Sequence, residues 1–287
     1  MWSMEREKRR NGVLKKLKDK KQVIYDEVFE TVVTAAAWVL LLLAYMPVYC
    51  MICLSVKPAI FQYADFWGWP DEPNWGVFGW AAGAFAEGVF NTMYVIVVTC
   101  LLMLLVSMLS GYVFARLQFP GKEFLYLMVM IFLMIPEVLH FTPRYTIVRD
   151  LGLTDTWWAL ILPWAAAGQI WGTMLIRNHV EGIPKELFEA ARIDGCNEFQ
   201  AMLRIALPLS RPIMATVVVI KMVDFYNDFT WPLVVMNNSE QQVITVLVRM
   251  NANSIPGYAV ACVPLLVLFL CTSSLYMEGM TSGAIKG

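Results

Sequence analysis

Four long stretches of the sequence contain no charged residue. They cover residues 31–56, 88–115, 156–176 and 250–277. A helix needs about 20 mostly apolar residues to cross the hydrocarbon core of a bilayer, and each stretch reaches that length. Two further apolar stretches, 124–143 and 212–236, contain a few charged side chains. Together these patterns predict an all-α, polytopic membrane protein with six transmembrane helices.

The composition agrees with this class. Hydrophobic residues make up 59% of the 287 residues and charged residues 16%, whereas soluble domains are about one-quarter charged. Cys50 and Cys53 have CxxC spacing, but they lie inside an apolar stretch and no second pair of ligands accompanies them. We expect them to pack as small apolar side chains without a metal. The lipid bilayer is the expected surrounding, and no nucleic acid is expected as a partner.

The basic residues predict the orientation. With six transmembrane helices and both ends on the same side, 17 Lys and Arg residues fall on the side of the termini and four on the other. Lys and Arg are enriched in cytoplasmic loops, so both termini are predicted to be cytoplasmic. The apolar stretch after the basic head is too long for a signal peptide, and we expect the head to be retained.

One membrane domain is expected. Its predicted parts are a cytoplasmic basic head (1–30), a first transmembrane helix (31–56), an outer loop (57–87), a core of five transmembrane helices (88–280) with a cytoplasmic loop at 177–211, and a cytoplasmic tail (281–287). The outer loop is rich in aromatic residues. An aromatic belt at the membrane surface is the favoured interpretation; docking of an external partner or of a sugar is the alternative.

The cytoplasmic loop is predicted to form a hairpin of two helices. Pro184 suits the first position of a helix, and Gly195 suits the left-handed conformation that ends one. Asn197 is a typical N-cap of a second helix, which Pro208 is expected to end.

The first helix of this hairpin needs a packing partner. It is about three turns long, too short to be stable alone in water. Leu187, Ala190, Ala191 and Asp194 share one face by three- and four-residue spacing. That face is expected to pack either on the protein's own helices or in a groove of a cytoplasmic partner.

The same segment carries a long, fixed pattern of residue types. Glu189-Ala190-Ala191 is followed by Gly195, Ile205 and Leu207-Pro208, and this spacing resembles the "EAA" loop of the permease subunits of bacterial ABC importers. The segments "NTMYVIVVT", "GYVFARLQFPG", "LGLTDT" and "IPKELFEAARIDG" follow one another as in the carbohydrate-uptake permeases of the maltose and glycerol-phosphate type. The ending "GMTSGAIKG" is similar to the end of the maltose-type subunit.

The resemblance implies a function and a set of partners. It implies the transmembrane permease subunit of an ATP-driven sugar importer in the bacterial cytoplasmic membrane, with a second permease, two ATPase subunits and an extracytoplasmic binding protein. The residues implied to couple to the ATPase are Glu189, Ala190, Ala191, Asp194, Gly195, Ile205, Leu207 and Pro208. Gly283, Ala284 and Gly287 of the tail are expected to reach the ATPase interface. The chain has no GxxxxGK[ST] segment, so ATP is expected on the partner ATPase, and neither a catalytic site nor a cofactor is expected here.

Polar residues close to one another suggest substrate contacts. "FYNDF" departs from the family's usual Trp-Asn-Asp-Phe, because Tyr226 replaces Trp. The candidate residues of the substrate path are Tyr226, Asn227, Asp228 and Trp231. These residue types offer aromatic faces and hydrogen-bonding groups to a sugar.

Ionisable residues inside the predicted transmembrane helices are the remaining candidates, because such residues usually face protein or water. They are Glu137, His140, Lys221 and Asp224. Lys221, Asp224 and Asp228 are expected to share one helix face. Lys221 and Asp224 are expected either to form a structural ion pair or to contact the substrate. A buried hydrogen-bonded pair is expected for Glu137 and His140. An ion-coupled secondary transporter that uses these charges is the alternative function, and a membrane assembly factor is a third.

Overall fold

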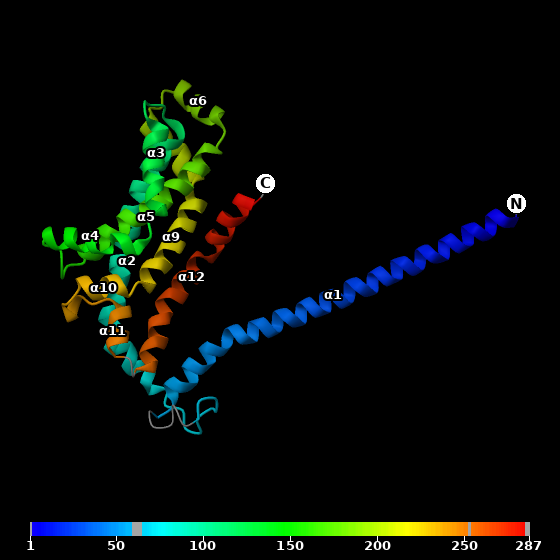
Figure 1. Ribbon diagram of the computed structural model, residues 1–287, viewed down its shortest axis with the longest axis horizontal. Helices are drawn as coiled ribbons and strands as arrows, with labels where there is room; N and C mark the ends of the chain where they lie inside the picture. Colours follow the sequence, from blue (N-terminus) through cyan, green and yellow to red (C-terminus); the bar gives the residue numbers. More distant parts are fainter. Residues whose placement is uncertain (1, 59–64, 252–253, 285–287) are drawn as a thin grey trace. The chain divides into compact units, whose positions relative to one another are not determined.

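The computed structural model describes residues 2–58, 65–251 and 254–284. Among these, it describes the side chains of residues between 28 and 273, with the exception of residue 239. Every regular element in the described part is a helix, which confirms the all-α prediction. The chain divides into two compact units, residues 1–74 and 75–287, and Figure 1 shows the course of the helices in each. The two units are described in turn.

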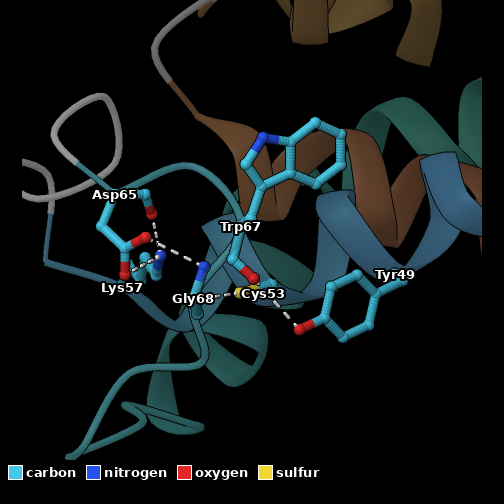
Figure 2. Close-up of polar contacts among 6 residues, drawn as sticks. All are labelled: Tyr49, Cys53, Lys57, Asp65, Trp67 and Gly68. Atoms are coloured by element: carbon cyan, nitrogen blue, oxygen red, sulfur yellow. Dashed lines mark hydrogen bonds and ion pairs between the residues drawn. The ribbon is translucent and has the colours of Figure 1, made fainter.

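The first unit is one long helix and the loop that follows it. Helix α1 (Trp2–Val56) runs without a break through the basic head and the first apolar stretch, and Val28–Val56 is long and apolar enough to cross a membrane. Figure 2 shows how the loop returns to the end of this helix. The Lys57 ammonium donates to the main-chain oxygen of Asp65 and lies 3.5 Å from its carboxylate.

Two further contacts hold the same loop. The Cys53 thiol donates to the main-chain oxygen of Gly68 over 3.0 Å, and the Tyr49 hydroxyl donates to that of Trp67 over 3.3 Å. The Asp65 carboxylate accepts from the Gly68 N–H over 3.0 Å and closes a tight turn. Cys53 therefore serves as a hydrogen-bonding side chain in the loop.

The second unit is built on four helices that pack pairwise, with α2 and α5 in the most extensive contact. They are α2 (Gly76–Arg116), α5 (Trp158–Glu181), α9 (Arg211–Asn227) and α12 (Ile255–Ala284). Small residues let α2 and α5 approach closely, because a methyl group on Gly172 would overlap the side chain of Ser107. Met103, Ile161 and Val217 are among the fully buried apolar residues that form the core between these helices.

Helix α2 begins twelve residues earlier than the sequence predicted. The predicted outer loop ran to residue 87, but the chain is helical from Gly76. Residues 76–87 are rich in helix-compatible Ala and Phe and contain a single charge, Glu87. The loop between α1 and α2 is shorter than expected for that reason, and the extra turns lengthen α2 beyond what a bilayer requires.

The third predicted transmembrane helix is bent instead of straight. Helix α3 (Lys122–Ile131) and a short 3₁₀ turn η2 (Phe132–Met134) end before Pro136, and α4 (Glu137–Asp150) leaves at 102°. Ile135 is extended, with φ −79° and ψ 119°. The α conformation is disfavoured for a residue before proline, and proline cannot donate the next helical hydrogen bond, so the prediction of one continuous helix over 124–143 was wrong.

The stretch 212–236 is also interrupted. Helix α9 ends at Asn227, and α10 (Thr230–Val235) starts after a break at Asp228. Asp228 is extended, with φ −69° and ψ 114°. It is thus outside the helix, and the expectation that it shares a face with Lys221 and Asp224 was wrong. A 3₁₀ turn η4 (Ser239–Gln241) and α11 (Ile244–Met250) lead on to α12.

The number of membrane-crossing helices depends on two bent pairs of helices, Lys122–Met134 with Glu137–Asp150 and Glu198–Leu209 with Arg211–Asn227. Four helices of the described part are long and apolar enough to cross a membrane, and the count reaches six when each bent pair is one crossing. At its other end, α12 continues to Ala284. Residues 285–287 of the predicted tail, with Gly287, lie outside the described residues, as do the side chains of the tail.

Candidate functional site

The helical hairpin at 185–209 lies at one end of the second unit, with α10 and α11 away from it (Figure 1). Its first helix, α6 (Lys185–Ile193), is followed by α7 (Glu198–Ala201), a π-helical turn η3 (Met202–Ala206) and α8 (Leu207–Leu209). The chain then bends by 71° into α9. The hairpin is the segment that the sequence predicted for coupling.

Both turns of the hairpin are built by the residues that the sequence indicated. Gly195 has φ +80°, the left-handed conformation that favours glycine. The N–H of Cys196 bonds to the oxygen of Ala191 over 2.9 Å, and the N–H of Gly195 bonds to that of Arg192 over 3.0 Å. This is the Schellman arrangement, which satisfies the free carbonyls at the end of α6.

Asn197 caps the second helix as predicted. Its side chain accepts from the N–H of Gln200 over 2.8 Å, and the Gln200 side chain accepts from the N–H of Asn197 over 3.0 Å. This reciprocal pair satisfies two donors at the helix start. Pro184 was predicted as the first helical residue of α6. With ψ 135° it is instead the N-cap, and Lys185 is the first helical residue.

Pro208 was expected to end the second helix, but it does not. The helix continues to Leu209, and the chain turns at Ser210. A proline ring clashes with the carbonyl four residues before it in a regular α-helix. Here the preceding turn is widened, because the N–H of Leu207 bonds to Met202, five residues back. This π turn accommodates Pro208 within the helix.

Helix α6 turns one face inward. Phe188 and Ala191 are buried, with 5% and 8% of their surface exposed. They pack in a small apolar cluster with residues of α2, α5 and η3; its buried members include Met108, Tyr112, Ile176, Val180, Ile183, Ala201, Met202 and Ala206. Ile205 and Leu207 of the predicted coupling set are half-buried against this cluster. Part of the hairpin therefore packs on the protein's own helices.

The opposite face of α6 is left open. Glu189, Ala190 and Asp194 are exposed, as are the larger apolar residues Leu187 (45%) and Ile193 (87%). The expected shared face is thus divided: Ala191 points into the cluster, while Leu187, Ala190 and Asp194 do not. The 3.6-residue period places Phe188 and Ala191 one above the other, so the true inner face is centred on Phe188.

Arg116 connects the hairpin to α2. Its guanidinium donates to the main-chain oxygen of Val180 over 2.6 Å and also to that of Ile183. It lies 4.1 Å from the centre of the Phe188 ring, a distance typical of a cation–π contact. One side chain at the end of α2 therefore contacts the end of α5, the loop before α6, and α6 itself.

Tyr112, one turn before Arg116, makes a second connection. Its hydroxyl donates to the Glu198 carboxylate over 2.8 Å, and that carboxylate pairs with Arg192 over 2.6 Å. The hydrogen bond to Glu198 raises the pKa of the Arg192 guanidinium above its ordinary value. Sequence reasoning missed Tyr112 and Arg116 as site residues, although both lie in the segment "GYVFARLQFPG".

Three of the four candidates for substrate contact have structural partners. Trp231 is completely buried, and its indole N–H donates to the oxygen of Ala159 over 2.9 Å. Tyr226 is buried and donates to the oxygen of Ala261.

The Asp228 carboxylate accepts from the Trp164 indole over 2.9 Å and from the N–H of Trp231 over 3.1 Å. It therefore caps α10. Asn227 is exposed, and its amide bonds within its own helix to Val223 over 2.9 Å. Of the four candidates, only Asn227 is exposed.

Glu137 and His140 do not form the expected buried pair. The side chain of Glu137 is 70% exposed and lies 3.5 Å from Arg144. Both candidates belong to α4, beyond the bend at Pro136, so they are not in the middle of a straight transmembrane helix. Arg144 also lies 3.9 Å from the centre of the Trp231 ring. Arg144, which the sequence analysis did not single out, is thus the partner of Glu137.

The expected ion pair of Lys221 and Asp224 is present, with 2.9 Å between Nζ and Oδ2. Across the described residues, no three His, Cys, Asp or Glu side chains are grouped as metal ligands would be.

Comparisons with known proteins place the chain among transport proteins. An arabinooligosaccharides transport system permease protein of Halalkalibacterium halodurans is 33% identical over 214 residues, which is 72% of this chain and 76% of the relative. A melibiose/raffinose/stachyose import permease protein of Bacillus subtilis is 28% identical over 267 residues, 89% of this chain and 96% of the relative.

The fold is shared with a solved structure. A bacterial ABC transporter involved in the import of the acidic polysaccharide alginate contains a chain that superposes with a TM-score of 0.75 at 19% identity, covering 87% of this chain and 96% of that one. Residues 103–278, which include the whole hairpin, match the family described as the binding-protein-dependent transport system inner membrane component. The chain belongs to that family of membrane permease components.

Proposed function

We propose that this chain is a transmembrane permease subunit of an ATP-driven importer of sugars. Its family membership and its oligosaccharide-transporting relatives support this function. The observation that carries the proposal is the divided surface of α6. This helix is anchored on one face by Phe188 and Ala191 and exposes Leu187 and Ile193 on the other. A partner that covers the exposed face removes apolar surface from water.

The exposed face of α6 suits a cleft on an ATPase subunit. Ala190 is small and permits close approach, and the apolar side chains of Leu187 and Ile193 fit a groove as the anchors of an amphipathic helix do. Glu189 and Asp194 place negative charge beside them, so the cleft is expected to carry a basic residue. ATP is bound by that partner and not by this chain.

Movement of the ATPase reaches the transmembrane helices through the hairpin. When the ATPase subunits close on ATP, α6 moves with them, and Arg116 and Tyr112 transmit that motion to α2. A partner shifts such an equilibrium only through different affinities for its two states. The inner face packs α6 against the transmembrane helices of this chain, while the outer face is available to the ATPase.

The complete importer has further subunits. A second permease, two ATPase subunits and an extracytoplasmic binding protein complete it in the bacterial cytoplasmic membrane. Six crossings result when α3 with α4 counts as one crossing and α9 as another, beside the four helices that are long enough alone; the hairpin arm 198–209 then lies outside the bilayer. Both termini and the hairpin are then cytoplasmic, in agreement with the distribution of Lys and Arg. The ion-coupled alternative receives no support, because Glu137 pairs with Arg144 and Asp228 caps a helix.

Co-purification in mild detergent tests this function. The wild-type chain is expected to bring an ATPase and a second permease with it. Glu189→Lys reverses the charge at the α6 face and is expected to weaken the ATPase association or to uncouple hydrolysis from uptake. Glu87→Lys is the matched control, because Glu87 is exposed on α2 away from the hairpin. Sugar uptake by wild type without any ATPase would contradict the proposal.

A further inference from the structure

The Lys221–Asp224 ion pair is not used by the coupling hairpin, and its surroundings are unusual for a transmembrane helix. The ammonium of Lys221 lies 2.9 Å from Asp224 and 5.3 Å from the centre of the Trp171 ring on α5. The Lys221 side chain is only 14% exposed, whereas that of Asp224 is 55% exposed. The carboxylate is therefore the charge that this group presents to its surroundings.

Lys221 and Trp171 lie at similar distances from the hairpin end of their helices. Lys221 is ten residues after Arg211, where α9 begins, and Trp171 is ten residues before Glu181, where α5 ends. Both of these helix ends adjoin the hairpin (Figure 1). At 1.5 Å per residue the two side chains are about 15 Å from that end, which is roughly half the thickness of the hydrocarbon core.

The neighbouring positions form one continuous polar face. Asn227 is exposed one turn after Asp224, and Trp171 is 40% exposed beside Lys221. Ala167 is exposed one turn before Trp171 on α5. We call the face made by Trp171, Lys221, Asp224 and Asn227 the midplane face; it runs from Lys221, about 15 Å from the hairpin end, to Asn227, the last residue of α9, about 24 Å from it.

Lipid is an unsuitable neighbour for this face. A charged side chain at the centre of a bilayer is costly, and such groups usually face protein or a water-filled cavity. Lys221 lowers that cost for Asp224 but is itself turned inward, so the exposed carboxylate needs water or polar groups. An exposed aromatic ring beside a carboxylate and an amide is the kind of surface to which a sugar binds, with C–H groups on the ring and hydroxyls on the oxygens.

We propose that the midplane face lines the water-filled path of the importer and contacts the sugar as it passes. This inference rests on the proposed function and narrows its substrate class. Trp171 stacks on the apolar face of a sugar ring, Asp224 and Asn227 accept hydrogen bonds from its hydroxyls, and Lys221 holds Asp224 in place. The exposed charge is negative, so the path favours neutral sugars and disfavours acidic ones.

Cysteine labelling in native membrane vesicles tests whether water reaches this face. Asn227→Cys is made in a chain whose six native cysteines are replaced and which retains uptake, and is treated with cationic and anionic membrane-impermeant methanethiosulfonates. Leu101→Cys is the control, because Leu101 is 64% exposed on α2 and fifteen residues, or about 22 Å, from the end of that helix at Arg116. Asn227 is at a similar depth, sixteen residues or about 24 Å from Arg211. Asn227→Cys is expected to react and Leu101→Cys is not.

The charge of the reagent tests the selectivity. The cationic reagent is expected to label Asn227→Cys at least about five-fold faster than the anionic one, because Asp224 is one turn away. Adding Asp224→Asn is expected to remove that preference. The proposal is overturned if neither reagent labels Asn227→Cys in the resting or the ATP-bound state, if labelling occurs only after the subunits are separated, or if the anionic reagent is faster. None of these results depends on which ATPase binds α6, so failure here is distinct from failure of the coupling function.

Discussion

Arg116 shows how one side chain can join three elements. Its two main-chain acceptors and the Phe188 ring belong to segments more than 60 residues away in sequence. No periodicity in the sequence reports such a contact, because it depends on how α2 and α5 pack. The roles of Gly195 and Asn197 were predictable, in contrast, since capping and turn residues act through their immediate neighbours.

Replacing Arg116 tests whether the hairpin transmits motion to α2. Arg116→Ala removes two charge-assisted hydrogen bonds and is expected to destabilise the folded complex by about 2 kcal/mol and to lower the sugar imported per ATP hydrolysed. Thermal unfolding and the ratio of uptake to ATPase activity measure the two effects. Arg204→Ala is the control, because Arg204 is exposed on the hairpin. An unchanged ratio in a folded Arg116→Ala complex would remove Arg116 from the coupling path.

The conformation of Gly195 gives a second prediction at this scale. Gly195→Ala places a side chain at φ +80° and is expected to cost about 1–2 kcal/mol, with a loss of uptake because the turn after α6 shifts. Gly182→Ala is the matched control, since Gly182 also ends a helix but has φ −76°. Circular-dichroism melts of both purified variants check the prediction; equal melting temperatures would mean that the turn tolerates a side chain.

Helix breaks are the features of the elements that the sequence analysis missed. The apolar stretches indicated where helices lie, but not that Pro136 bends one of them by 102°. The signal was present, because the residue before a proline avoids the α conformation. The sequence gives a weaker signal for the break at Asp228. Its carboxylate accepts from the N–H of Trp231, three residues later, and so caps α10. This role is visible only once a new helix is known to begin there. The buried face of α6 was predicted one residue out of register for a similar reason: Phe188 reaches Arg116, a partner from another element.

The contact of α2 with α5 carries a prediction of its own. Gly172→Ala puts a methyl group against Ser107, which forces the helices apart, and is expected to destabilise the protein by roughly 1–3 kcal/mol. Gly83→Ala, on α2 with no neighbouring atom within 4 Å, is expected to be neutral or slightly stabilising. Thermal inactivation of uptake compares the two variants. Equal inactivation temperatures would show that the helix contact adapts to the methyl group.

At the scale of the whole molecule, the sequence was sufficient for the fold class and the family and insufficient for the functional surfaces. Long apolar stretches and the spacing of the EAA loop can be read directly from the order of residues along the chain. The exposed face of α6 and the midplane face depend on which side of each helix is covered. That is why Trp231 was predicted as a substrate contact but is buried, while Trp171 was not singled out but is exposed.

One measurement tests the central claim, that α6 docks on an ATPase through its exposed face. A photo-crosslinking residue is placed at Ile193, which is 87% exposed on α6, and in a second variant at Leu139, which is 68% exposed on α4. After illumination of membranes that import sugar, the residue at Ile193 is expected to be linked to an ATP-binding subunit, with a yield that changes when ATP is added. The residue at Leu139 is not expected to form that adduct. Links from Ile193 only to this chain or to lipid, in membranes with intact uptake, would contradict the account.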